Sequence, residues 1–313
     1  MRSSHACAER LLERIDERGW RGRIVPIDHL PDLEKAILGR FEGGLLNAAL
    51  YREQLGFFSF DPPANLPAAC SIVIVAAPTP PMRIVFHWRG ERVPVVVPPT
   101  YVGCTPRTES VQAVLETWLR KDGYRLAKPK LPLKTLAVRS GLAEYGRNNL
   151  CFVPGLGSFL QLVGGFTDLP CENDPWREPK ALDRCASCVA CLRRCPTGAI
   201  ADDRFLLRAE RCLTYHNEAA GDFPDWIDPS WHHCLIGCMR CQAVCPENAA
   251  VRDWFEDRAE FSEQETAFFI GRVPLERLPA ETAAKLRSLA INEDYRQLCR
   301  NLSMIVGREK CAG

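Results

Sequence analysis

The stretch CASCVACLRRCPTGAI, residues 185–200, places four cysteines within sixteen residues. Their spacing is C-x2-C-x2-C-x3-C, and a proline follows the fourth cysteine. A second stretch, CMRCQAVCP at residues 238–246, repeats the end of this pattern as C-x2-C-x3-C-P. Spacers of two residues let one short loop direct several thiolates toward a single inorganic group. The two stretches therefore predict a site that binds metal through sulfur.

The composition favours metal binding over a disulfide framework. The chain has 313 residues, 16 cysteines and a formal net charge of +1. Disulfide frameworks are typical of small secreted domains, whereas this N-terminus is too charged for a signal peptide and no apolar run could cross a bilayer. We expect a cytoplasmic protein without membrane contact, whose thiols stay reduced. The near-zero net charge also argues against a strongly basic surface for nucleic acid.

Two [4Fe–4S] clusters explain the spacing best. Each cluster takes four thiolates, and in two-cluster ferredoxins the fourth cysteine of a run binds the other cluster. This rule assigns one cluster to Cys185, Cys188, Cys191 and Cys245. It assigns the other to Cys195, Cys238, Cys241 and one further cysteine. Zinc bound by four cysteines is the alternative, but zinc does not require a proline after both runs.

The eighth ligand has two candidates. The repeat would place a cysteine at position 235, where this chain has Leu235. Cys234 lies one residue away, and Cys212 lies further upstream in RCLTYHNE. A shift of one residue turns a side chain in another direction unless the loop bulges, which favours Cys212.

Local patterns outside the cysteine runs predict an α+β fold. The continuous apolar run SIVIVAAP, 71–78, is typical of a buried strand. MRIVFHW and RVPVVV flank Arg89 and Gly90 and predict a hairpin with Pro94 on an edge strand. Ser262 and Glu265 have the spacing of a capping box. Helical spacing is predicted for residues 8–18, 109–121, 132–142 and 258–308.

These patterns divide the chain into three expected parts. The first, residues 1–170, mixes strands and helices. The second, residues 171–250, is rich in cysteine and proline and should be a ferredoxin-like domain organised by its clusters. The third, residues 251–313, is a helical C-terminal extension.

A longer segment resembles a known family. LAVRSGLAEYGRNNLCFVPGLGSFLQLVGGFTDLP, residues 136–170, is followed by the first cysteine run, by RCLTYHNE and by GCMRCQAVCPEN. This order resembles the epoxyqueuosine reductases, part of a superfamily of cobalamin-dependent reductases that includes the reductive dehalogenases. INEDYRQLCRNLSMIVG, 291–307, also resembles a C-terminal segment of the family that ends in an arginine–asparagine pair. The resemblance covers residues 68–250 well and the termini loosely.

The resemblance implies a mechanism. In the family, a cobalamin lies on a nitroreductase-like α/β domain and receives electrons singly from two clusters. Residues 1–170 would then be the corrinoid and substrate domain, and Cys212 would be the eighth ligand. By the same resemblance, the corrin would lie against Gly141, Tyr145, Asn148, Asn149, Gly157 and Ser158.

The chain also departs from the family. Epoxyqueuosine reductases carry an aspartate proton donor shortly before the LAVRS segment, whereas residues 124–137 contain no acidic residue. The lysine of the family's GKN motif is replaced by Arg147, and we find no counterpart of its C-terminal repeat domain. We therefore expect a small-molecule substrate, with tRNA an unlikely partner. The electrons would come from an external donor such as ferredoxin or flavodoxin.

Tyr101 and Arg147 are the candidate catalytic residues. Tyr101 follows two prolines at the end of a predicted strand, and a phenol with a pKa of about 10 can protonate a carbanion. Arg147 would stabilise the negative charge. The alternative role for Tyr101 is packing. The alternative for the whole chain is an electron-transfer or maturation protein that relays electrons to a partner and has no substrate of its own.

Overall fold

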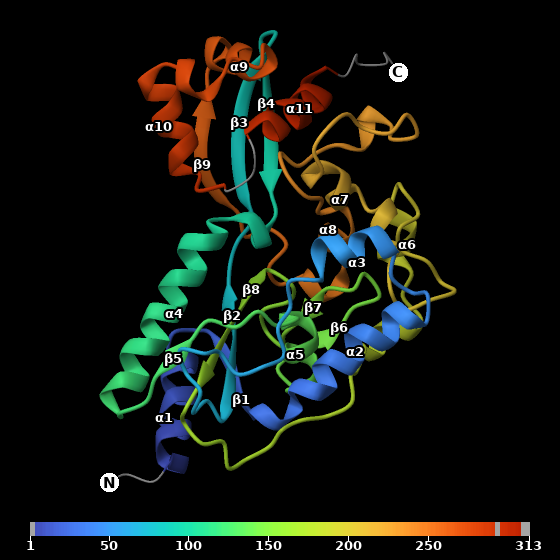
Figure 1. Ribbon diagram of the computed structural model, residues 1–313. Coiled ribbons are helices and arrows are strands. Elements are labelled where there is room, and N and C mark those ends of the chain that lie inside the picture. The colour runs from blue at the N-terminus through green and yellow to red at the C-terminus, as the bar shows by residue number, and fades with distance from the viewer. Residues whose placement is uncertain (1–3, 292–294, 308–313) are drawn as a thin grey trace.

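A four-stranded sheet and a three-stranded sheet organise the chain, one toward each end of the molecule (Figure 1). The computed structural model describes residues 4–291 and 295–307. The larger helices are α1 (Ser4–Glu17), α2 (Leu30–Glu42), α3 (Ala48–Gln54), α4 (Cys104–Lys121), α5 (Leu133–Arg139), α9 (Glu263–Ile270), α10 (Ala280–Ser288) and α11 (Tyr295–Val306). This mixture of sheets and helices confirms the predicted α+β class.

The four-stranded sheet has the order β1-β2-β8-β5, and every neighbouring pair is antiparallel. Its strands are β1 (Arg21–Pro26), β2 (Ser71–Pro78), β5 (Leu126–Ala127) and β8 (Leu160–Thr167). Alternate residues of β2 enter two different cores. Ile72 and Ile74 pack with the side of the sheet that α2 and α5 cover, and Val73 and Val75 pack with α1 and α4. Because both faces are covered, the strand is apolar along its whole length, as predicted.

The three-stranded sheet has the order β4-β3-β9. β3 (Met82–Trp88) and β4 (Glu91–Val97) form the predicted hairpin, with positive φ at Arg89 and Gly90 as the tight turn requires. Pro94 lies on β4, which is an edge strand, so its missing N–H interrupts no ladder.

The third strand of this sheet comes from the C-terminal segment. β9 (Glu256–Phe261) pairs in parallel with β3, so the segment expected to be helical begins with a strand. From α9 onward the segment is helical, and the predicted capping box between Ser262 and Glu265 is present. Phe86 of β3 stacks on Phe261 of β9 with ring centroids 5.0 Å apart, and both rings are fully buried. The hairpin and the C-terminal segment therefore share one core.

Short helices and loops make up residues 171–250. The α-helices of this cysteine-rich segment are α6 (Ala190–Arg194), α7 (Leu213–Glu218) and α8 (Arg240–Ala243). This segment lies beside the two-stranded sheet of β6 (Glu144–Tyr145) and β7 (Cys151–Phe152), and Tyr145 forms a β-bridge with Ala181. Such short elements bury little apolar area of their own, so the segment depends on other contacts for its structure.

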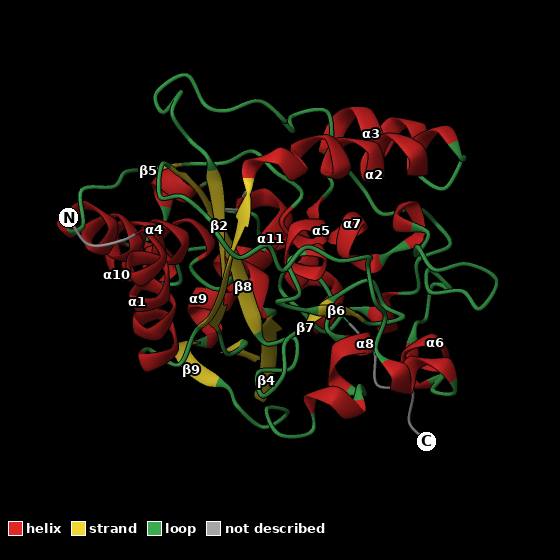
Figure 2. Cartoon of the chain, turned by 90° about the horizontal axis from the view of Figure 1, so that it is seen from below, coloured by secondary structure: helices red, strands yellow, loops and turns green. Residues whose placement is uncertain are grey.

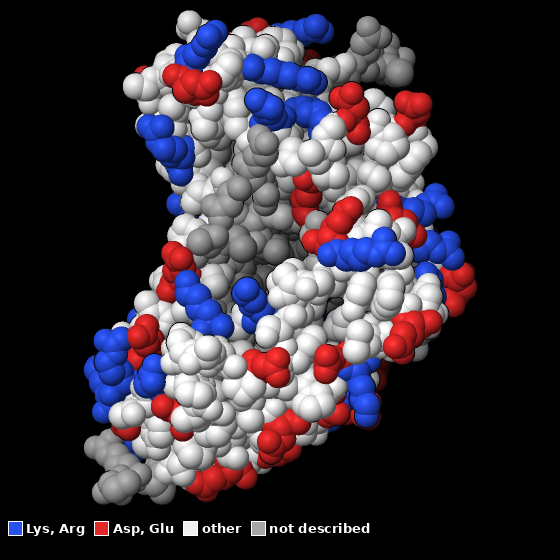
Figure 3. Space-filling view, in the orientation of Figure 1, with Lys and Arg blue, Asp and Glu red and all other residues white. Residues whose placement is uncertain are grey.

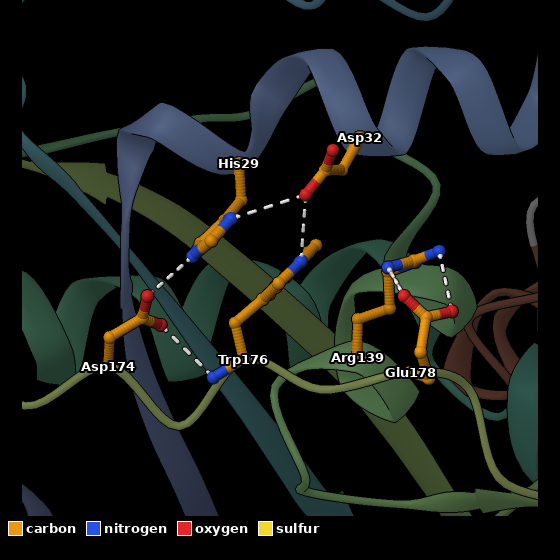
Figure 4. A network of polar contacts seen from close by, with 6 residues as sticks. All are labelled: His29, Asp32, Arg139, Asp174, Trp176 and Glu178. Atoms are coloured by element: carbon orange, nitrogen blue, oxygen red, sulfur yellow. Dashed lines mark hydrogen bonds and ion pairs between the residues drawn. The ribbon is translucent and has the colours of Figure 1, made fainter.

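A polar network fastens the start of this segment to the first part of the chain (Figure 4). The His29 ring stacks on Trp176 at 4.2 Å, and its Nε2 lies 2.8 Å from Asp174 Oδ2. Trp176 Nε1 donates to Asp32 Oδ2 of α2 at 3.0 Å. Arg139 at the end of α5 pairs with Glu178 at 3.4 Å. We call the four-stranded sheet and the helices that cover it the sheet domain. The connection between this domain and residues 185–245 is therefore anchored on α2 and α5.

The surface carries charges of both signs. On the face shown in Figure 3, lysine and arginine side chains are interspersed with aspartate and glutamate. Among the described helices, none is long and apolar enough to cross a bilayer.

Candidate functional site

Eight cysteines gather in two groups. Cys185, Cys188, Cys191 and Cys245 line a small cavity of about 20 Å³, and we call them the first cysteine group. Cys195, Cys212, Cys238 and Cys241 line a larger cavity, and we call them the second cysteine group. In the described part of the chain, no three His, Cys, Asp or Glu side chains converge as they would around one ion. The groups match those predicted from the crossing rule, and the role of their members as ligands stays a prediction.

The prolines explain why the last cysteine of each run joins the other group. A residue before proline is pushed out of helical conformation into an extended one. Cys195 ends α6 with ψ 109° before Pro196, and Cys245 has ψ 123° before Pro246. At Cys195 and at Cys245 the backbone therefore leaves the helical conformation. The side chain of each then turns away from the other cysteines of its run.

The structure separates the two candidates for the eighth position. Cys212 precedes α7 as its N-cap residue and lines the larger cavity. Cys234 is fully buried beside Phe159 and Met239, and it lines neither cavity. Its backbone forms a bridge with Val96 of β4, so Cys234 has a packing role.

Burial affects the chemistry of these thiols. It raises the pKa of Cys238 to about 12 and the pKa of Cys245 to about 11. Without metal, both thiols therefore keep their protons at neutral pH. Because metal binding requires thiolates, loading the site must release these protons.

The larger cavity has a volume of about 460 Å³, within the range of small-molecule sites. One wall is apolar and comes from α3 and the turn before it, through Leu45, Leu46, Leu50, Tyr51 and Leu55. The second cysteine group and α7 also line the cavity, and α3 and α7 lie near each other in both views (Figures 1 and 2). The cavity therefore lies where the sheet domain meets the cysteine-rich segment.

Two of the predicted corrin-binding residues line this cavity, Asn148 and Asn149. The Asn148 side chain is 3% exposed, and its Nδ2 has no hydrogen-bond partner within the described residues. Its Oδ1 accepts from Leu150 N at 3.3 Å. A buried amide donor without a partner is unfavourable unless a ligand accepts from it. Asn148 also lines the small cavity of the first cysteine group, so its unpartnered donor borders both cavities.

The other four predicted residues lie elsewhere. Gly157 faces Asn248, whose Oδ1 would lie 2.4 Å from a Cβ at that position, and Ser158 N donates to the same Oδ1 at 2.8 Å. Tyr145 is buried, and its hydroxyl lies 3.2 Å from Thr135 Oγ1. Gly141 has φ +73° and contacts Arg177. In the structure, these residues shape turns and fasten the cysteine-rich segment to the sheet domain.

Tyr101 lines the larger cavity and is held on three sides. Its hydroxyl donates to Glu218, which lines the cavity too. Its ring lies against Gly237, where an added Cβ would come within 2.5 Å of the ring. Gln161 Nε2 donates to Pro99 O and Val102 O, both at 3.0 Å, and so fixes the turn that carries Tyr101. Residue spacing did not predict the contact between Tyr101 and Glu218, because only the fold brings α7 to this turn.

Arg147 lies at the first cysteine group and does not line the larger cavity. Its backbone N is 3.4 Å from Cys185 Sγ, and its guanidinium donates to Cys185 O at 2.6 Å and Cys188 O at 3.2 Å. Its contacts suit it to hold the loop of the first cysteine run.

Comparisons with known proteins agree with the cysteine pattern. A family described as a 4Fe-4S double cluster binding domain matches residues 184–248. The epoxyqueuosine reductase of Bacillus subtilis is 35% identical over 115 residues, which cover 37% of this chain and 28% of that protein. The epoxyqueuosine reductase of Burkholderia pseudomallei is 28% identical over 214 residues, covering 64% and 51%. The matches thus span between about a quarter and a half of these relatives' lengths.

Solved structures show the same fold over nearly the whole chain. An epoxyqueuosine reductase from Bacillus subtilis, with its catalytic aspartate loop swung out of the active site, has a TM-score of 0.68. It is 22% identical and covers 97% of this chain and 82% of that chain. The chain therefore has the fold of these reductases, and its cysteine-rich segment matches a 4Fe-4S double cluster binding domain.

The comparisons correct one expectation. A small-molecule substrate, with tRNA an unlikely partner, was expected from the near-neutral charge and the missing acid, and this prediction is wrong. The relatives are epoxyqueuosine reductases, and one structure of the same fold (TM-score 0.67, 22% identity, 97% of this chain and 82% of that chain) is of that enzyme with an epoxyqueuosine-modified tRNA-Tyr stem loop. Net charge failed as a criterion because it averages over the whole surface and says nothing of one face.

The choice of Cys212 over Cys234 can be tested by metal content. Anaerobically reconstituted protein should contain about eight iron and eight sulfide per chain, from two four-iron clusters. Cys212→Ala should lower both counts to about four, because one cluster loses a ligand. Cys234→Ala is the matched control and should keep about eight. The reverse pattern, or stoichiometric zinc, would contradict the assignment.

Proposed function

We propose that this protein is an iron–sulfur reductase that acts on epoxyqueuosine in tRNA. One observation carries the proposal: a single cavity is lined both by the second cysteine group and by residues of the sheet domain. A nucleoside that enters the cavity would lie next to the source of electrons. The relatives named above supply the substrate class.

The reaction sets clear demands on the chain. Reducing an epoxide to an alkene consumes two electrons and two protons and releases water. Bound to the two cysteine groups, [4Fe–4S] clusters would supply the electrons one at a time from a low-potential one-electron donor. The second cysteine group lines the cavity and the first does not, so the first suits electron entry.

Cobalamin is the proposed cofactor of the larger cavity. The cavity offers an apolar wall on α3 for a flat ring and the unpartnered Asn148 donor for an amide oxygen, and a corrin carries both features. When bound, cobalamin would supply two-electron reduction at its cobalt. Lys134 and Asn149 also line this region, so amide and phosphate oxygens of a ligand would find donors there.

Tyr101 is the proposed proton donor. It stands in the cavity that holds the second cysteine group, and its hydroxyl already donates to the Glu218 carboxylate. This hydrogen bond orients the phenol, and after each transfer Glu218 can take a proton from solvent and pass it to the phenolate. The turn of Tyr101 is fixed by Gln161, so the hydroxyl is preorganised. Tyr101 and Glu218 would together take the role that an aspartate has in the relatives.

Cobalamin binding should depend on Asn148. Asn148→Asp keeps the acceptor for Leu150 N, replaces the Nδ2 donor by an acceptor and adds a negative charge, which the control variant adds as well. We expect it to weaken binding by about 5- to 150-fold, the equivalent of about 1–3 kcal/mol for an unsatisfied buried acceptor. Equilibrium dialysis with cobalamin measures this, and the exposed Asn173→Asp is the control. Equal affinity in both variants would remove Asn148 from the binding site.

The proposed substrate can be supplied directly. Protein with both clusters and cobalamin, reduced by dithionite and methyl viologen, should convert an epoxyqueuosine-modified tRNA-Tyr stem loop. Mass spectrometry of the released nucleoside should show the loss of one oxygen atom. Fully loaded protein that gives no product would reject this substrate. Loaded clusters with neither cobalamin binding nor product would favour the electron-transfer alternative.

Tyr101→Phe should lower turnover by about 100- to 10,000-fold, the usual contribution of a general acid. Iron content and cobalamin affinity should not change, because the ring that packs on Gly237 is kept. Tyr124→Phe is the control, since Tyr124 packs near α1 and α4 and lines neither cysteine cavity. Turnover of Tyr101→Phe within a few-fold of the original rate would return Tyr101 to a packing role.

A further inference from the structure

Two neighbouring polar residues lie on the buried side of α11. Arg300 is 7% exposed and Asn301 is fully buried, between apolar residues that belong to the core of the three-stranded sheet. A buried arginine and asparagine are unfavourable unless every donor finds an acceptor. Their partners therefore show what the helix holds in place.

Arg300 binds the end of α7. Its Nη2 donates to His216 O at 2.8 Å and to Asn217 O at 3.2 Å, and its Nη1 donates to Ala219 O at 2.8 Å. These carbonyls belong to the last turn of α7, where helix carbonyls lack partners within the helix. The guanidinium also lies 4.0 Å from the centre of the Phe223 ring. One side chain thus fixes the helix whose N-cap residue is Cys212.

Asn301 ties the same helix to the other ligand segment. Its Nδ2 donates to Asn217 O and to Leu235 O, both at 2.9 Å, and its Oδ1 accepts from Arg300 Nη2 at 3.0 Å. Asn217 in turn donates through Nδ2 to Gly237 O at 2.7 Å. Gly237 is the residue before Cys238. The chain from α11 through α7 to Gly237 therefore fixes Cys212 relative to Cys238.

We propose that Arg300 and Asn301 are positioning residues for the second cluster alone, holding its two ligand segments and supplying a buried positive charge. This inference rests on the two-cluster function proposed above. Within the described residues, no hydrogen bond of Arg300 or Asn301 reaches the first cysteine group. Burial lowers the pKa of Arg300, yet a guanidinium stays charged at neutral pH. Arg300 donates to the last turn of α7, whose N-cap residue is Cys212, and a positive charge at that helix favours the more negative, reduced state of a cluster bound there.

The test uses the fully reconstituted protein and three variants. Asn301→Asp keeps the shape but removes both donors, and the iron count should fall from about eight to about four. Arg300→Gln removes the positive charge and the paired N–H donors of the guanidinium. At a fixed potential, the ratio of reduced to oxidised second cluster should fall at least about tenfold, which equals about 59 mV for one electron. Arg300→Lys keeps the charge and should recover part of this shift.

Two controls make the result specific. Electron paramagnetic resonance of Cys212→Ala protein identifies the signal of the first cluster, which should be unchanged in all variants. Arg296→Gln, at an exposed position of the same helix, should behave as the original protein. Eight iron with both potentials unchanged would overturn the inference. Equal loss of both clusters with a lowered melting temperature would overturn it too, because that outcome indicates a general structural role.

Turnover does not enter this test. Protein that passes it but leaves the tRNA stem loop unchanged would reject the proposed substrate and retain the positioning role. Conversely, product formation with unaltered cluster signals in Asn301→Asp and Arg300→Gln would retain the reductase and reject the positioning role.

Discussion

Each cysteine group combines side chains from distant parts of the sequence, and the rest of the structure depends on this constraint. Cys245 joins the first run across the loop that carries α7, and Cys195 joins residues that follow it. The segment between them has only short helices, and few of its side chains are deeply buried. Bonds from thiolates to iron would give such a segment the cohesion that an apolar core gives elsewhere. The sheets on either side provide the rigid frame against which it is held.

Local signals predicted much of this frame. The run at β2 is apolar because both faces of the strand are covered, and a covered strand leaves that mark in the sequence. The hairpin and the capping box depend on neighbouring residues, so their signals are also local. β9 left no such mark. Its residues EDRAEF are largely charged, and only pairing with a distant strand makes them a strand.

The same division between local signals and long-range contacts applies to the candidate site. The cysteine groups follow from spacing and from the conformation that proline imposes on the residue before it. The resemblance predicts that Gly157 and Ser158 lie beside a cofactor, which stays a prediction, and the structure adds a contact of both with Asn248, shortly after the second cysteine run. Arg147 and Glu218 give a second example, because Glu218 lines the larger cavity and Arg147 does not. Which of them faces the cavity is decided by how α7 and the loops meet, and residue spacing does not encode that.

The parallel pairing of β3 with β9 has a consequence for biosynthesis. The two strands enclose the whole cysteine-rich segment in the sequence, so the hairpin leaves the ribosome long before its partner strand. Until then one edge of β3 presents unpaired amides, a state prone to association with other chains. Once β9 is paired, the cysteine-rich segment is a closed loop whose ends can no longer separate.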